Sequence, residues 1–378
     1  MRGMMRLALL GVPGTQGGEA PITWLLKASF EGPDLAAGEV PAELGMPYVE
    51  VGGPLMIVQS GSGKFAVSDN ALLFPSGGNS WNAATVRGDA IGRANGVAVL
   101  FGVLVDVASA HARIGLSNNA SIGETSWSSG LYIHNSGQLK TVLSSFADLL
   151  PYSATTDYTM AFVMFDSCTL VLVKIGVISN WILIHVDLTT DAIVYPALAS
   201  HSQTGVFNLW RARQLPAPFD VDYGPTTIHE ATPVSGTSYT ATANAIHDLT
   251  ITAPNPLAGE CALEYRVADD NNKWRSYFNS SGAYRLDSVA SGAATNRINV
   301  ASAITAGATR TLRTRSIGTR HNAYTLSGTN WTKRGGEINH SHQDTATTIK
   351  PVAGAGWTLG ALRSWPTTSP AYAELDRT

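Results

Sequence analysis

Three side chains near the end of the sequence could together bind a metal ion. His340, His342 and Asp344 are spaced two residues apart, so on a strand all three would project from one face. Imidazole nitrogens and a carboxylate are ligands that zinc and related metals accept. The three residues follow a pair of glycines in a polar stretch, which favours an exposed, unliganded turn over a metal site.

Aromatic rings beside predicted turns are candidates for stacking on sugar rings. There are three such residues in each half of the chain: Trp81, Trp127 and Tyr132, then Trp274, Tyr277 and Trp331. A flat ring on or beside a turn could pack against a pyranose. Most large aromatic side chains in a β-sandwich fill its core, so burial is the competing interpretation for each of the six.

Sequence motifs of several enzyme classes are missing. The run GSGK at residues 61–64 evokes a phosphate-binding loop, but it lacks the first glycine, and Phe65 stands where a Ser or Thr would hold magnesium. We interpret this run as a hairpin turn. The sequence contains neither a G-x-S-x-G elbow nor an H-E-x-x-H motif.

The balance of charge argues against nucleic acid as a partner. The chain has 25 basic and 28 acidic side chains and a formal charge of -3, so it has no general field that would attract a polyanion or an anionic membrane. One basic cluster stands out, formed by Arg310, Arg313, Arg315 and Arg320. Arg313 and Arg315 share one face of a strand, and we expect that face to be solvated.

The elements that must position these residues are strands. The chain is 44% hydrophobic and 14% charged, and its 37 glycines and 18 prolines are spread between short apolar runs. Residues 262–291 show three strands separated by polar turns, and residues 99–144 contain a looser copy. The closing blocks GVFNLWRARQLPAP and GWTLGALRSWPTTSP also correspond. The sequence therefore predicts an all-β protein with two related antiparallel β-sandwiches in tandem.

We expect four segments along the chain. Residues 1–27 form an extended N-terminal leader, 28–216 the first sandwich, 217–228 a proline-rich connector and 229–378 the second sandwich. The connector has little freedom and predicts a fixed relative orientation. The leader offers apolar side chains to a groove of another subunit, and the open alternative is a first strand of the first domain.

Neither disulfides nor membrane insertion is expected. Cys168 and Cys261 each lie beside an apolar run, which is typical of buried thiols. The longest apolar stretch, 158–175, is interrupted by Asp166 and charged at Lys174, so it favours two buried strands. The opening residues only partly imitate a secretory signal, so we do not expect secretion by a signal peptide.

The second half carries a resemblance to a known fold. Its strands and turns, with the runs RVADDNN, KWRSYFN and AYRLDSVASG, resemble the concanavalin A-like jelly roll of laminin-G, pentraxin and laminarinase-type modules, and most of all the versions repeated in bacteriophage tail and fibre proteins. The resemblance covers most of 229–378 and, less clearly, 22–216. It implies two stacked antiparallel sheets in each domain, and it says little about function because the pattern encodes meander geometry.

The resemblance also bears on possible sites. The E-x-D-x-x-E motif of laminarinase-type hydrolases is not present, so we do not expect an enzyme. Asp269, Asp270 and Asn271 resemble the turn where laminin-G modules bind calcium, and 340–344 resembles a His-x-His motif through which three phage fibre chains share a metal. Calcium or another metal is the cofactor that these likenesses imply, while any tight turn favours Asx residues without a metal.

These observations lead to one main hypothesis and two alternatives. The main hypothesis is a non-enzymatic virion structural protein, part of a phage tail tip, fibre or capsid decoration, assembled in the host cytoplasm. Its expected partners are other virion proteins, further copies of itself, with a trimer as the usual form, and a host surface glycan. The alternatives are a free carbohydrate-binding module or lectin and, third, an enzyme that acts on polysaccharide.

Overall fold

The computed structural model describes thirteen stretches of the chain. They are residues 22–59, 64–73, 84–94, 96–105, 112–122, 126–134, 136–142, 148–153, 156–176, 179–200, 205–215, 230–328 and 330–376. The predicted connector and most of the predicted leader lie outside these residues, as does Trp81.

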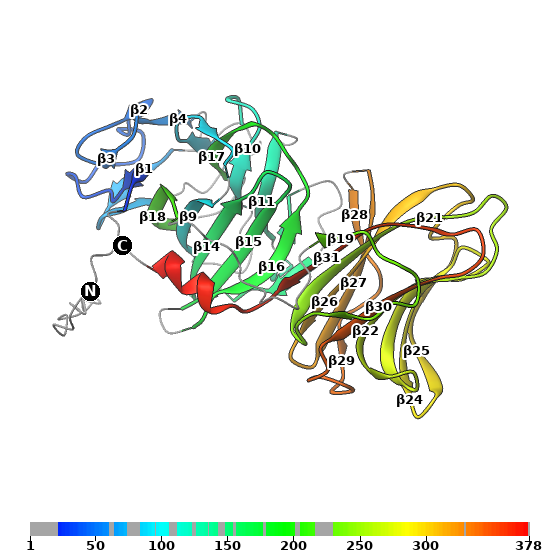
Figure 1. Cartoon of the computed structure of the whole chain (residues 1–378). Coiled ribbons are helices and arrows are strands. Elements are labelled where there is room, and N and C mark those ends of the chain that lie inside the picture. The colour runs from blue at the N-terminus through cyan, green and yellow to red at the C-terminus, as the bar shows by residue number, and fades with distance from the viewer. Residues whose placement is uncertain are drawn as a thin grey trace.

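The first sandwich consists of two antiparallel sheets (Figure 1). Sheet I has the order β16-β15-β14-β9-β18-β1-β3, with β5 and β6 attached beside β18. Its strands are β1 (Trp24–Ala28), β3 (Val49–Val51), β5 (Ala66–Ser68), β6 (Ala71–Leu73), β9 (Val97–Val105), β14 (Asp157–Met164), β15 (Thr169–Ile175), β16 (Ile182–Asp187) and β18 (Gly205–Gln214).

Sheet II has the order β13-β12-β11-β10-β17-β7-β4-β2, and β8 also pairs with β17. Its strands are β2 (Glu43–Leu44), β4 (Leu55–Gln59), β7 (Ala84–Arg87), β8 (Ile91–Gly92), β10 (Ala112–Ser117), β11 (Trp127–His134), β12 (Gln138–Thr141), β13 (Asp148–Pro151) and β17 (Ile193–Ser200). Strand β1 begins at Trp24, inside the predicted leader of residues 1–27, and pairs with β18, so the first sandwich begins before residue 28.

The second sandwich is built from sheets III and IV. Sheet III has the order β19-β31-β21-β26-β27-β28 with β29 beside β27, and sheet IV has the order β20-β30-β22-β23-β24-β25. Their strands are β19 (Glu230–Ala231), β20 (Tyr239–Thr240), β21 (Ala245–Thr252), β22 (Cys261–Asp269), β23 (Asn272–Phe278), β24 (Tyr284–Ala290), β25 (Ala293–Val300), β26 (Thr309–Ile317), β27 (Arg320–Ser327), β28 (Asn330–Lys333), β29 (Ile338–Asn339), β30 (Thr348–Ala353) and β31 (Thr358–Pro366).

The two sandwiches share one topology. The order β16-β15-β14-β9-β18-β1 in sheet I matches β28-β27-β26-β21-β31-β19 in sheet III, strand for strand and in the same sequence order. In the same way β13-β12-β11-β10-β17-β7 of sheet II matches β25-β24-β23-β22-β30-β20 of sheet IV. The predicted all-β fold of two tandem antiparallel sandwiches is therefore confirmed, and the two similar closing blocks are the matched strands β18 and β31.

The apolar stretch that raised a membrane question is a hairpin of sheet I. Strands β14 and β15 pair from Tyr158–Ile175 to Met164–Thr169. One face of this hairpin lies in the sandwich core, and the other is covered by apolar residues of the second sandwich and the C-terminal turn. Because both faces are buried, the strands are apolar throughout instead of alternating. Among the described residues no helix is long and apolar enough to cross a membrane.

The C-terminal turn returns to the first sandwich. The 3-10 helix η1 (Pro370–Asp376) follows β31, and its Tyr372 and Leu375 are buried against the outer face of sheet I. Lys174 Nζ lies 2.7 Å from Asp376 Oδ1. Figure 1 shows this turn, in red, beside the first sandwich. The last segment of the chain therefore ties the second domain back to the first.

The two sandwiches meet through buried arginines. Arg313 and Arg315 on β26 are 1% and 2% exposed. Arg315 donates hydrogen bonds to the main-chain oxygens of Ile184, at 2.8 Å, and Leu149, and Arg313 donates to the oxygen of Val186 at 2.7 Å. These oxygens belong to β16 and β13, the edge strands of sheets I and II. The guanidinium groups thus occupy edge positions that another strand could otherwise use.

This burial corrects the expectation that both arginines lie on a solvated face. Arg313 donates two hydrogen bonds of 2.7 Å to the carboxylate of Asp248, and its guanidinium lies 3.7 Å from the ring centre of Trp331. The alternation of side chains correctly placed Arg313 and Arg315 on one face. The first sandwich covers that face, which a pattern within one strand does not reveal.

Both cysteines should be unreactive in the folded protein. Cys168 and Cys261 are free and buried, and burial raises the pKa of the Cys168 thiol to about 11 and that of Cys261 to about 12. Because the thiolate is the nucleophile, we expect no reaction with a disulfide reagent under native conditions and reaction of both thiols in denaturant. Thiol titration with and without denaturant checks this, and rapid native labelling of either cysteine would contradict it.

Stability should fall in mild acid because two buried histidines resist protonation. Burial lowers the pKa of His247 and of His321 to about 3, from an ordinary value of 6.5. As the pH falls from about 6.5 towards 3, the unfolded chain binds protons that the folded chain does not. Each imidazole then lowers the free energy of unfolding by about 1.4 kcal/mol per pH unit.

Urea denaturation at several pH values measures this slope. The rings of His321 and Trp274 stack with their centres 4.1 Å apart. The variant His321→Phe keeps an aromatic ring in that position and removes one titrating group. Its stability should fall less steeply between about pH 6.5 and 3. Equal slopes for the variant and the parent protein would show that His321 titrates normally in the folded state.

Candidate functional site

The outer face of sheet IV carries a set of polar side chains in register. Leu263, Tyr265 and Trp274 point into the core of the second sandwich, so their neighbours Glu264 and Arg275 project from the opposite face. The first sandwich contacts sheet III through Arg313 and Arg315, and Figure 1 shows β22, β24 and β25 on the side away from the first sandwich.

Five side chains form one row across five strands, which we name the polar ladder. Strand pairing places Lys350 opposite Glu264, Glu264 opposite Arg275, Arg275 opposite Asp287, and Asp287 opposite Asn296. Directly opposite residues in a sheet lie close enough for their side chains to interact. Charge alternates along the row, from Lys350 through Asp287, so the ladder has no net charge.

Glu264 is the most enclosed member of the ladder. Its side chain is 4% exposed, and its Oε1 lies 2.9 Å from Lys273 Nζ and 3.2 Å from Arg275 Nε. Its Oε2 is 4.0 Å from Lys350 Nζ and is a buried atom without a hydrogen-bond partner. The hydrogen bond that Lys350 donates to the carboxylate of Asp270 raises the pKa of Lys350, which keeps that end of the ladder cationic.

The other end of the ladder is organised around Asp287. Its carboxylate accepts hydrogen bonds of 2.7 Å from the hydroxyl of Tyr277 and from Nδ2 of Asn296. Burial and the hydrogen bond to Asp287 raise the pKa of Tyr277, so the hydroxyl keeps its proton. The guanidinium of Arg275 lies 4.7 Å from the ring centre of Tyr277. Arg285, opposite Tyr277, has a buried Nε without a hydrogen-bond partner.

This arrangement suits a ligand with many hydroxyl groups. The ladder contains planar groups, a guanidinium, two carboxylates and an amide, which hold one another in fixed positions. Hydrogen-bond donors therefore alternate with acceptors along the sheet face. A sugar hydroxyl both donates and accepts, so neighbouring hydroxyls can bridge adjacent rungs.

The described aromatic candidates for sugar stacking are all buried. Their exposed fractions are 2% for Trp127, 6% for Tyr132, 0% for Trp274, 5% for Tyr277 and 2% for Trp331. The sequence-based expectation of open stacking surfaces is therefore corrected for these five residues. Each ring is covered by its own neighbours.

Different partners bury the different rings. Trp274 lies in the core of the second sandwich and donates to the main-chain oxygen of His342 at 2.8 Å. Trp127 and Tyr132 belong to a small apolar cluster of the first sandwich. Tyr277 lies beside the ladder, and Trp331 lies under Arg313 at the domain interface.

The candidate metal ligands do not assemble into a site. Nε2 of His342 lies 2.6 Å from the main-chain oxygen of Val289, and Nδ1 of His340 accepts a hydrogen bond from the main-chain nitrogen of His342. The charge of Asp344 acts on Arg266. The guanidinium of Arg266 lies 3.3 Å from a further imidazole, that of His321. Within the described stretches, no group of three or more His, Cys, Asp or Glu side chains could hold a metal ion.

The predicted calcium turn is an Asx turn held by its own hydrogen bonds. Oδ1 of Asp269 accepts from the main-chain nitrogen of Asn271 at 2.7 Å and from Nδ2 of Asn272 at 3.0 Å. The bond from Asn272 is the main reason that the pKa of Asp269 is lowered. Asp270 points to Lys350, whose Nζ lies 2.7 Å away. The carboxylates are thus used within the chain and do not converge.

Sequence reasoning missed the ladder, although it singled out the strands that carry it. Glu264, Arg275 and Asp287 all fall in the three-strand pattern of residues 262–291. Their charged types at alternate positions were a usable signal, since such residues face away from a core. The pattern did not show that they lie in one row, because register depends on the turns between the strands.

Comparisons with known proteins give weak structural likenesses. No family model and no curated protein matches the sequence. A galectin, LEC-6 of Caenorhabditis elegans, is 12% identical with a TM-score of 0.30 and covers 36% of this chain and 96% of its own. The carbohydrate-binding module CBM66 of Bacillus subtilis is 15% identical with a TM-score of 0.29, over 37% of this chain and 92% of its own.

A third solved structure covers a larger part of the chain. It is the exoplasmic/lumenal domain of VIP36 in a form bound to Ca2+ and Man3GlcNAc, 10% identical with a TM-score of 0.36, over 51% of this chain and 91% of its own. Likenesses at these identities and TM-scores carry no argument about function. The assignment of the fold rests on the strand order of the four sheets.

Proposed function

We propose that the protein binds neutral carbohydrate on the outer face of sheet IV and does not transform it. The observation that carries this proposal is the polar ladder, in which charged and amide groups alternate in register across five strands. The absence of net charge along the row disfavours polyanions, and its polarity disfavours a lipid surface. A hydroxyl-rich, uncharged ligand matches both properties.

The geometry of the ladder also favours binding over hydrolysis. Its two carboxylates, Glu264 and Asp287, lie two strands apart with Arg275 between them. A glycosidase needs the scissile bond between its two carboxyl groups, and here a guanidinium occupies the intervening position. Incubation with neutral polysaccharides should release no new reducing ends, and release that stops on replacement of Glu264 would establish an enzyme instead.

Binding of the purified protein to immobilised glycans tests the proposed function. We expect retention of neutral oligosaccharides and weaker retention of sulfated or uronic-acid-containing chains of the same length, because a row without net charge does not offset the cost of removing an added anionic group from water. The intact chain is the probe, since its two sandwiches share a buried interface. Failure to retain any neutral glycan, or a preference for sulfated chains, would contradict the proposal.

A structural role within a larger assembly is the second candidate. Four of the six large apolar side chains that are exposed in the described residues belong to residues 25–58 of the first sandwich: Leu25 at 41%, Met46 at 76%, Val51 at 36% and Val58 at 53%. Burial of such side chains against another chain is favourable, which supports the virion hypothesis of a homo-oligomer that displays sugar-binding domains.

Sedimentation of the intact chain over a range of concentrations tests this second candidate. We expect an oligomer that the paired variant Met46→Ser with Val58→Ser weakens, because both substitutions remove apolar surface that a second chain would cover. A monomer at every concentration would remove the assembly proposal and leave a free carbohydrate-binding protein.

A further inference from the structure

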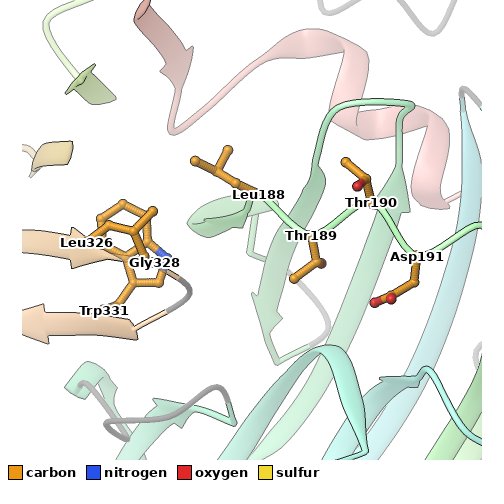
Figure 2. Close-up of a pocket in the computed structure, with 7 residues that line it drawn as sticks. All are labelled: Leu188, Thr189, Thr190, Asp191, Leu326, Gly328 and Trp331. Atoms are coloured by element: carbon orange, nitrogen blue, oxygen red, sulfur yellow. The ribbon is translucent and has the colours of Figure 1, made fainter. Parts of the chain in front are cut away.

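A pocket lies between the two sandwiches, apart from the polar ladder. It has a volume of about 330 Å³ and is lined from the first domain by the loop between β16 and β17 and from the second domain by the β27–β28 hairpin. The lining residues are Leu188, Thr189, Thr190, Asp191, Leu326, Gly328 and Trp331. Figure 2 shows the first four across the gap from the last three. A pocket of this size is at the lower end of the range for small-molecule sites.

The wall from the first domain is held in place by partly buried hydrogen bonds. Arg93 donates from Nε to the main-chain oxygen of Asp191 at 2.8 Å and from Nη1 to that of Phe165 at 3.1 Å. Thr189 donates from its hydroxyl to the main-chain oxygen of Ser128 at 2.6 Å. The loop is therefore fixed before any ligand arrives, which lowers the entropy cost of binding.

The wall from the second domain is fixed by the domain interface. The ring of Trp331 lies under the guanidinium of Arg313, 3.7 Å from its centre, and contacts the ring of His185 edge to face at 5.8 Å. Arg313 is itself locked by the carboxylate of Asp248. Figure 2 draws the indole nitrogen of Trp331 on the side that faces Thr189. Both walls are thus rigid, and each domain supplies one of them.

The chemistry of the lining selects the class of ligand. Leu188, Leu326 and Trp331 give an apolar and aromatic surface, while Thr190 and Asp191 give a hydroxyl and a carboxylate. The lining contains one acid and no base, which disfavours an anion. An organic cation would use the face of an aromatic ring, but Arg313 already lies over Trp331 and places a positive charge behind it. With anions and organic cations disfavoured, the lining fits a neutral ligand that has one apolar face and several hydroxyl groups.

We propose that this pocket binds a single neutral hexose residue. Its C–H face packs on Leu188 and Leu326 beside the rim of Trp331, and its hydroxyls donate to the carboxylate of Asp191 and exchange hydrogen bonds with Thr190. The pocket involves sheet III and the first sandwich, whereas the polar ladder lies on sheet IV. This second site is separate from the ladder and stands whether or not the ladder binds sugar. It also requires both domains, so neither half of the chain alone would form it.

Titration with glucose, galactose and mannose, followed by tryptophan fluorescence and by ligand NMR, tests the proposal on the intact chain. The isosteric variant Asp191→Asn should weaken binding of the preferred hexose about tenfold or more, because it replaces a charged acceptor with a neutral one. Thr190→Val should weaken it by a smaller factor. The matched control is Asp69→Asn, which makes the same change at an exposed turn of the first sandwich and should leave the affinity unchanged.

Three results would overturn the proposal. They are equal affinities for the Asp191→Asn and Asp69→Asn variants, no binding of any of the three hexoses by the parent protein, and tighter binding of tetramethylammonium than of every hexose. The last result would make the pocket a cation site. Thermal unfolding of each variant accompanies the titration, so that a loss of binding is attributed to the pocket only where the fold is intact.

Discussion

Replacing Arg313 with methionine is expected to lower the free energy of unfolding by about 3–5 kcal/mol. The substitution keeps most of the apolar stem but removes both hydrogen bonds to Asp248, which is 0% exposed, and the bond to the main-chain oxygen of Val186. A buried carboxylate then remains without its partner, which is the costly part of breaking such a pair. Urea denaturation followed by tryptophan fluorescence measures the loss.

Two further variants make this prediction specific. Arg320→Met removes an arginine from the same sheet whose side chain is 53% exposed, and its effect should stay within about 0.5 kcal/mol. Combining Arg313→Met with Asp248→Leu removes both charges and should recover much of the stability. If Arg313→Met lowers the free energy of unfolding no more than Arg320→Met does, Arg313 is not buried at the interface. The two sandwiches are then not joined through Arg313.

The second large effect concerns sugar binding on sheet IV. Replacing Arg275 with alanine should weaken binding of neutral oligosaccharide about 10- to 100-fold, because a charged hydrogen-bond donor contributes about 1.5–3 kcal/mol. Arg275 is the central rung of the ladder, between Glu264 and Asp287. Isothermal titration calorimetry of both proteins with one oligosaccharide measures the change.

The matched control for Arg275 is again Arg320, replaced in this case by alanine. It removes the same charge from sheet III, so sugar affinity should not change if binding takes place on sheet IV. Asn296→Ala is an independent test of sugar binding by the ladder. Asn296 is the exposed end of the ladder, so its replacement should not unfold the domain. A fall in affinity for Arg320→Ala as large as that for Arg275→Ala would mean that net charge, and not the ladder, governs binding.

The fold could be predicted from the sequence because its signals are local. Alternating apolar positions and turns rich in Asp, Asn, Ser and Gly mark the strands, and the repetition of a three-strand pattern and of a closing block indicates two similar domains. The matched strand orders of the two sandwiches are the structural form of that repetition. The hairpin within 158–175 was predictable in the same way, from the polar residues that interrupt it.

The interface between the domains was not predictable from the same signals. Alternation along β26 shows that Arg313 and Arg315 share a face, but the first sandwich, more than a hundred residues earlier in the chain, decides whether that face meets water. The prediction that aromatic rings beside turns are exposed failed for a related reason. A ring beside a turn can be exposed or can fold back into the core, and Trp274 does the latter because its indole nitrogen finds a main-chain acceptor at His342.

The candidate site falls between these two cases. The types and faces of Glu264, Arg275 and Asp287 follow from the sequence, because charged residues alternate with core residues in three neighbouring strands. Their assembly into one row depends on register. Register is set by the turns and by a local irregularity in the pairing of β22 with β23 between Tyr265 and Asp269. A shift of one residue would send the charged side chains to the core.

A crystal structure of the protein with its tightest-binding neutral oligosaccharide would show which surface holds the sugar. We expect sugar density over the outer face of sheet IV, with hydroxyl groups within hydrogen-bond distance of Arg275 and of at least one carboxylate of the ladder. A complex in which that face carries no sugar, while the ligand occupies only other surfaces, would contradict it.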